Sequence, residues 1–98
     1  MKKGYWVVAY RSIADPGALQ KYGPLARAAI EAAGGRTLVR TADAVEAHEA
    51  GLQQRVVVIE FESFEKALST YRSAASKEAL KALGSGVERD FRIVEGDA

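Results

Sequence analysis

The sequence predicts a single α+β domain in which a four-stranded antiparallel sheet carries its helices on one face. Residues 55–61 are the first observation, because a run of three valines and an isoleucine suits a strand and would crowd a helix. A helix start follows this run at once, with Ser63 as a cap and Glu65 in the first turn. Along the 98 residues, strand-like and helix-like segments follow the order β-α-β-β-α-β, which one domain accommodates.

The first strand and the first helix have clear sequence signals. Residues 4–11 are aromatic and β-branched, which is typical of a strand. Asp15 then caps a helix whose first position is Pro16, where the missing N–H is harmless. The dipeptide Gly23-Pro24 predicts a kink or a break in this helix. Gly34-Gly35 ends it.

The middle of the chain holds a short strand and an ambiguous segment. Residues 36–40 form the second strand. In residues 41–54 either a strand resumes at Val45 and Ala47 after a turn or bulge, or an alanine-rich helical turn forms.

The last third of the chain returns to clear signals. The helix that begins at Phe64 breaks at residues 73–76, and a short helix follows as far as Leu83. Residues 88–95 form the last strand, in which Phe91 and Ile93 share one face.

This order is the split βαβ pattern of ferredoxin-like folds. Right-handed crossovers place the first and third strands side by side in the middle of the sheet.

Composition excludes several classes of function. The net charge of +1 is not the footprint of a nucleic-acid-binding protein. The absence of cysteine excludes a disulfide scaffold and thiol catalysis. No segment approaches the roughly 18 apolar residues that cross a bilayer. We therefore expect a cytoplasmic protein that binds neither nucleic acid nor membrane.

Several short motifs resemble those of a known family. They are Gly4-Tyr5-Trp6, Asp15, Tyr22, Gly34-Gly35-Arg36, Leu38-Val39-Arg40, residues 55–61, Ser63-Phe64, Ala67, Tyr71-Arg72-Ser73 and Ile93-Val94-Glu95-Gly96. Over nearly the whole chain the sequence is similar to the bacterial domain-of-unknown-function family 1330, within the dimeric α/β-barrel superfamily. The resemblance implies a ferredoxin-like fold and a dimer, and superfamily relatives include cofactor-free oxygenases and isomerases. Ala74-Ala75-Ser76 and Leu83 depart from the family pattern, which has Pro-Glu-Tyr and often an arginine there.

Glu60 is the most informative polar residue. A carboxylate in an apolar strand loses solvation, which raises its pKa toward the value that a general acid or base needs. The alternative is a structural ion pair with an arginine of a neighbouring strand, for which Arg11, Arg40 and Arg92 are the candidates.

Five other side chains are candidate ligand-binding residues. Tyr22 and Tyr71 could donate hydrogen bonds in a cleft between helix and sheet, or belong to the core. Arg36 and Arg40 are expected on one face of their strand, where they could hold a carboxylate or simply cover the sheet. His48 is the only histidine and has no neighbouring ligand motif, so we expect no metal and no cofactor.

The apolar strands also predict an obligate homodimer that is joined through the sheet faces of its two subunits. Two helices cover one face of the sheet, and both faces of residues 5–10 are apolar. If Val57, Ile59 and Phe61 face the helices, Val56 and Val58 face away. The candidate interface residues are Val56, Val58, Trp6 and Val8.

These observations support two hypotheses for function. The first is a small-molecule site in the cleft between sheet and helices, in a cofactor-independent enzyme that uses Glu60 as acid or base. The second is a non-catalytic dimeric binding or interaction module without an active site.

Overall fold

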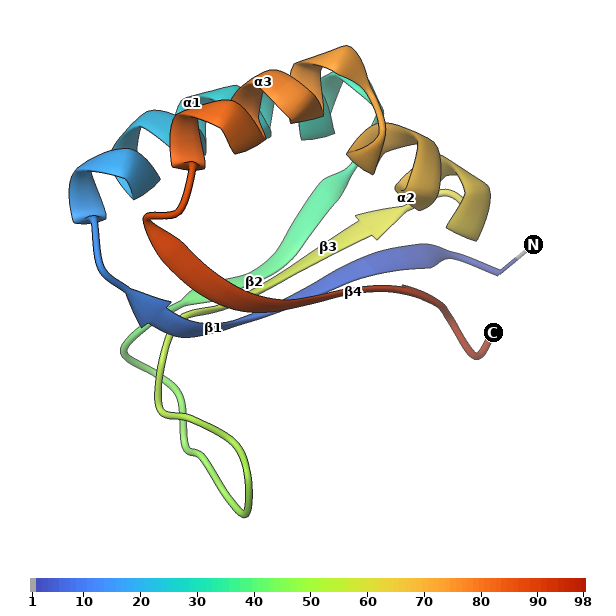
Figure 1. Ribbon diagram of the computed structural model, residues 1–98. Coiled ribbons are helices and arrows are strands. Elements are labelled where there is room, and N and C mark those ends of the chain that lie inside the picture. Colours follow the sequence, from blue (N-terminus) through green and yellow to red (C-terminus); the bar gives the residue numbers. More distant parts are fainter. Residues whose placement is uncertain (1) are drawn as a thin grey trace.

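The computed structural model describes residues 2–98. Its elements are β1 (Gly4–Ile13), α1 (Pro16–Ala32), β2 (Arg36–Thr41), β3 (Val56–Phe61), α2 (Phe64–Tyr71), α3 (Ala74–Leu83) and β4 (Val87–Glu95). The strands form one antiparallel sheet in the order β2-β3-β1-β4, and the helices lie over one of its faces (Figure 1). The ferredoxin-like arrangement predicted from the sequence is therefore confirmed. No helix within residues 2–98 is long and apolar enough to cross a membrane.

Side-chain caps begin all three helices. The Asp15 carboxylate accepts a hydrogen bond from the backbone N–H of Ala18 at 3.2 Å, and Ser63 Oγ accepts one from Lys66 at 3.0 Å. Ser73 caps α3 in the same way, so the predicted interruption at residues 73–76 is narrower than expected and α3 begins at Ala74. Each cap satisfies an N–H that the helix itself cannot bond.

Helix α1 continues through Pro24, so the break considered at Gly23-Pro24 does not form. Pro24 has no N–H to donate to the carbonyl of Gln20, one turn earlier. Both residues are exposed, so water can take the place of the missing hydrogen bond.

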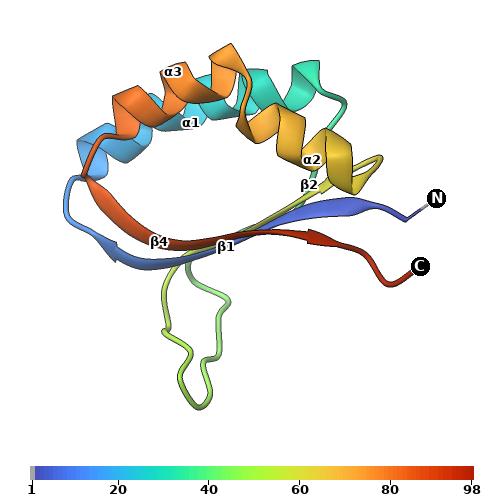
Figure 2. The same ribbon diagram turned by 45° about the vertical axis from the view of Figure 1, so that its right-hand side comes forward.

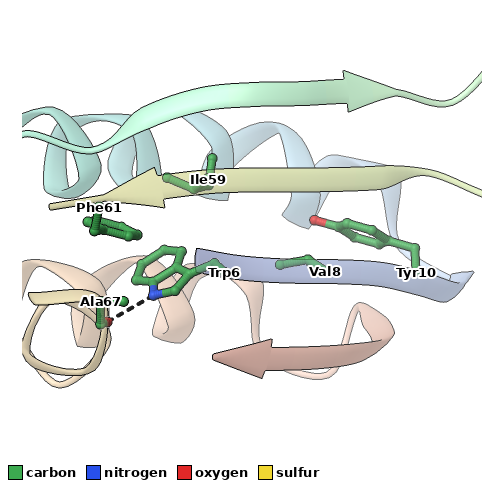
Figure 3. Packing of buried hydrophobic residues seen from close by; sticks show 6 residues of the cluster. All are labelled: Trp6, Val8, Tyr10, Ile59, Phe61 and Ala67. Carbon is green, nitrogen blue, oxygen red and sulfur yellow. Dashed lines mark hydrogen bonds between the residues drawn. The ribbon is translucent and has the colours of Figure 1, made fainter. Parts of the chain in front are cut away.

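The core lies between the sheet and the helices. Figure 3 shows its buried cluster, which consists of Trp6, Val8, Tyr10, Ile59, Phe61 and Ala67. The Trp6 indole N–H donates to the carbonyl of Ala67 at 2.9 Å, and the rings of Trp6 and Phe61 lie 5.0 Å apart. Trp6 and Val8 are thus placed under the helices and not on the open sheet face, where the dimer prediction had put them.

The face of the sheet that the helices leave open carries the alternate residues of the same strands. Val7 of β1 pairs with Val58 of β3, and Tyr5 pairs with Glu60. Val56 and Val58 are half-buried on this face, as their alternation with Ile59 and Phe61 predicts.

Residues 42–55 form neither of the two predicted structures and connect β2 to β3 as an irregular loop. Thr41 Oγ1 accepts a hydrogen bond from the Ala44 N–H at 3.2 Å where β2 ends. Glu49 has φ 54°, in the left-handed region, and the Gly51 N–H donates to the His48 carbonyl at 2.9 Å, which turns the chain back. The loop projects on the open-face side of the sheet, away from the helices (Figures 1 and 2).

Candidate functional site

A cavity of about 600 Å³ lies between α1 and the helix-covered face of the sheet. All four strands contribute to its lining, and apolar side chains such as Val8, Val57 and Ile59 form its floor. The wall on α1 includes the small residues Gly23 and Ala26, which leave space between the helix and the strands. These small side chains leave unfilled part of the space between α1 and the strands that large side chains would occupy in a filled core.

Two arginines of the cavity lining lie against the Tyr10 ring. Arg55 precedes β3 and shares the side-chain alternation of Val57, and Arg89 on β4 shares that of Phe91. The guanidinium carbons of Arg55 and Arg89 lie 5.8 and 5.6 Å from the centre of the Tyr10 ring. Arg89 also donates a hydrogen bond to the Tyr22 hydroxyl at 3.2 Å.

The cavity brings together only some of the residues predicted to bind a ligand. Tyr22 and Arg40 line it. Tyr71 packs in the adjacent core, where its ring lies 6.0 Å from that of Trp6 and 5.0 Å from that of Phe91.

Arg36 and Arg40 lie on opposite faces of the sheet, so the prediction that they share a face is wrong. Arg36 pairs with Glu60 on the open face, whereas Arg40 pairs with Val57. The reason is an irregularity in β2, where Leu38 is an extra residue between the pairs formed by its two neighbours. Such a bulge reverses the alternation of the side chains that follow it.

Glu60 lies on the open face and does not line the cavity, so it cannot serve as an acid or base there. Its carboxylate accepts hydrogen bonds from the Tyr5 hydroxyl at 3.1 Å and from Arg36 at 3.3 Å. The alternative of an ion pair with a neighbouring strand describes this geometry, but the partner is Arg36. Arg11 and Arg92, two of the arginines expected in that role, pair with Glu88 and Asp90 instead, and the third, Arg40, lines the cavity.

The hydrogen bond to Glu60, followed by burial, raises the pKa of the Tyr5 phenol. In Glu60→Gln the acceptor is neutral, so we expect the pKa of Tyr5 to fall toward the ordinary value of about 10. An NMR titration of the Tyr5 ring carbon that bears the hydroxyl measures this pKa. Glu62→Gln, which removes a neighbouring exposed carboxylate, should leave it unchanged. An equal pKa in wild type and Glu60→Gln would contradict the role assigned to this hydrogen bond.

His48 lies in the exposed loop, where its Nε2 is 2.6 Å from a carboxylate oxygen of Glu46. It contributes nothing to the cavity lining. Within residues 2–98, no three histidine, cysteine, aspartate or glutamate side chains gather as metal ligands would.

Sequence reasoning missed Arg55 and Arg89 as site residues. The signal was present in the alternation, because Arg55 stands two residues before Val57 and Arg89 two before Phe91. The sequence prediction assigned the apolar residues of these strands and Glu60 to a face of the sheet, but it did not assign Arg55 and Arg89.

Two solved structures are similar to this one in fold. A protein of unknown function from Rhodopseudomonas palustris is 19% identical, with a TM-score of 0.74, and the match covers 99% of this chain and 82% of that one. A Caulobacter crescentus protein proposed to be an antibiotic biosynthesis monooxygenase is 15% identical, with a TM-score of 0.57 and coverage of 99% and 89%. No curated protein matches the chain.

A family model covers almost the entire sequence and agrees with the fold. It matches residues 3–97, from just before β1 to just after β4. The chain belongs to the family described as a domain of unknown function, DUF1330.

Proposed function

We propose that this protein binds a small organic molecule in the cavity between α1 and the sheet. The observation that carries the proposal is the cavity itself, because about 600 Å³ lies within the range of roughly 300–1,000 Å³ that is typical of small-molecule sites. Its apolar floor and its few polar groups also fit such a site, since the floor binds the body of a ligand and the polar groups fix its orientation.

The role that the cavity supports is binding. With Glu60 on the other face, the charged side chains that line the cavity among residues 2–98 are the half-buried Arg55 and Arg89 and the exposed Arg27, Arg40 and Glu31. Arginine remains protonated at physiological pH, so these groups hold and orient a ligand and do not exchange protons with it. The proposed function therefore corresponds to the non-catalytic alternative derived from the sequence, a dimeric binding module.

We also propose that two copies pair through their open sheet faces. Val7, Val56 and Val58 form an apolar strip across this face, between the Arg36–Glu60 and Arg92–Asp90 ion pairs, and the helices cover only the opposite face. A twofold axis brings the same surface of each copy together, so an apolar face is covered by its own duplicate. The loop of residues 42–55 projects on this side of the sheet, where it would flank the partner (Figure 2).

Filling the cavity tests the binding proposal. Ala26 lies on α1 and lines the cavity, so Ala26→Phe should occupy the space that a ligand needs. In an NMR screen of neutral and charged aromatic fragments, we expect hits that shift the amide signals of Val57 and Ile59 in wild type and lose at least about tenfold in affinity in Ala26→Phe.

The matched control is Ala32→Phe, which adds the same ring to an exposed position of the same helix outside this cavity. Fragment affinities in this control should equal those of wild type. Hits that bind Ala26→Phe as tightly as wild type, or a screen without hits at the cavity, would contradict the proposed function.

A further inference from the structure

We propose that the ligand of this cavity is an organic carboxylate, and that Arg55 and Arg89 bind its carboxylate group beside Tyr10. This inference rests on the proposed small-molecule function of the cavity and names the chemical class of the ligand. Four features of the two arginines support it.

The first feature is the absence of an acidic partner. Three other strand arginines, Arg11, Arg36 and Arg92, each pair with a carboxylate at 3.0–3.3 Å. Among residues 2–98, neither Arg55 nor Arg89 forms a salt bridge. Because partly buried charges are normally paired, the positive charge of these two side chains is available to a ligand.

The second feature is that aromatic rings position both guanidinium groups. Arg55 and Arg89 both lie against the Tyr10 ring, and Arg89 is also 5.0 Å from the centre of the Tyr22 ring and 5.1 Å from that of Phe91. Cation–π contacts hold an arginine in place without using its N–H donors. Among residues 2–98, Arg89 donates one side-chain hydrogen bond, to Tyr22, and the Arg55 side chain donates none, so most donors of the pair are free for an anion.

The third feature is an unsatisfied donor. Arg55 Nε is buried and has no hydrogen-bond partner among residues 2–98. A buried N–H of a charged group without an acceptor is costly, and native structures rarely leave one unexplained. A carboxylate oxygen accepts from a guanidinium fork in the planar geometry that this donor requires.

The fourth feature is the balance of charge around an apolar floor. Among residues 2–98, Arg27, Arg40 and Glu31 also contribute to the lining and all three are exposed, so the half-buried Arg55 and Arg89 leave a net positive charge that favours an anion. The floor of Trp6, Val57 and Ile59 requires an apolar body on the same molecule. An aromatic or aliphatic carboxylate combines the two properties.

The test compares two probes of the same shape, 2-naphthoate and its neutral amide, 2-naphthamide. Titrated into isotope-labelled protein and followed by NMR, the naphthoate should bind at least about tenfold more tightly than the amide. Only the naphthoate should move the Arg55 Nε–H signal, because only it supplies a charged acceptor to that donor. Equal affinities would overturn the inference.

Substitution then assigns the effect to the two arginines. Arg55→Gln and Arg89→Gln should each lower naphthoate affinity at least about tenfold and change naphthamide affinity little. Arg72→Gln removes the same charge from an exposed position outside the cavity and should change neither affinity. Retention of the preference for naphthoate in both cavity variants would overturn the inference, and so would its loss in Arg72→Gln.

The outcomes also separate this inference from the proposed function on which it rests. If both probes bind at the cavity with equal affinity, the carboxylate assignment fails and the binding function stands. If neither probe binds, the carboxylate assignment also fails, and the fragment screen with Ala26→Phe decides the binding function independently. The comparison of the two probes uses the wild-type protein, so it holds even if an arginine variant does not fold.

Discussion

Val58→Asp is expected to convert the protein from a dimer into a monomer. Val58 lies on the open face of β3, opposite Val7 of β1, so the proposed twofold partner would bury it. An aspartate there would bring an unpaired carboxylate into an apolar interface, at a cost of several kcal/mol. In sedimentation equilibrium at micromolar concentration, the wild type should have twice the chain mass of 10.5 kDa and the variant should have the chain mass.

The control for this experiment is Leu25→Asp, which places the same charge on an exposed position of α1, in the helix layer. Because Leu25 is remote from the open face, that variant should remain a dimer. A wild-type protein that sediments as a folded monomer would refute the proposed assembly, and so would a Val58→Asp protein that stays dimeric.

Gly4→Ala is expected to destabilise the fold by about 3 kcal/mol or more, at the upper end of what overpacking costs. A Cβ atom at Gly4 would lie 2.3 Å from the Ser63 carbonyl oxygen and 2.7 Å from the Phe64 Cα. Both are backbone atoms at the start of α2, so the clash with the added Cβ atom can be removed only if the helix moves away from the sheet. Urea denaturation of both proteins at one protein concentration measures the loss in the free energy of unfolding.

Gly23→Ala is the comparison for this prediction. Outside its chain neighbours and the backbone of its own helix, a Cβ atom at Gly23 would meet no atom within 4 Å. The gain in helix propensity and the crowding against Pro24 oppose each other, so the free energy of unfolding should change by no more than about 1 kcal/mol in either direction. Equal stabilities of Gly4→Ala and wild type would show that β1 and α2 are not packed as closely as described.

The elements of the fold were predictable because their signals are local. Asp15, Ser63 and the β-branched run of β3 act through their nearest neighbours along the chain. The face of β1 that meets the helices was not predictable in this way, since both of its faces are apolar. That choice depends on contacts distant in sequence, such as the hydrogen bond from the Trp6 indole to the Ala67 carbonyl.

The candidate site was less predictable than the fold because it depends on a bulge in β2 and on the position of α1 above the sheet. The extra residue Leu38 places Arg36 and Arg40 on opposite faces of the sheet. Neither strand nor helical periodicity in the sequence reveals a bulge of this kind. The cavity depends on how far α1 stands from the strands, which follows from packing across the whole domain. Tyr22 and Arg40 were nevertheless recognised as ligand-binding candidates, and both line the cavity.

The location of a bound probe tests the central claim most directly. In a protein saturated with 2-naphthoate or with the best hit of the fragment screen, nuclear Overhauser effects identify the protons that lie against the ligand. We predict effects to the Trp6 indole and to the methyl groups of Val57 and Ile59, which line the cavity. Effects confined to Val7, Val56 and Val58 would place the ligand on the open sheet face and contradict the account.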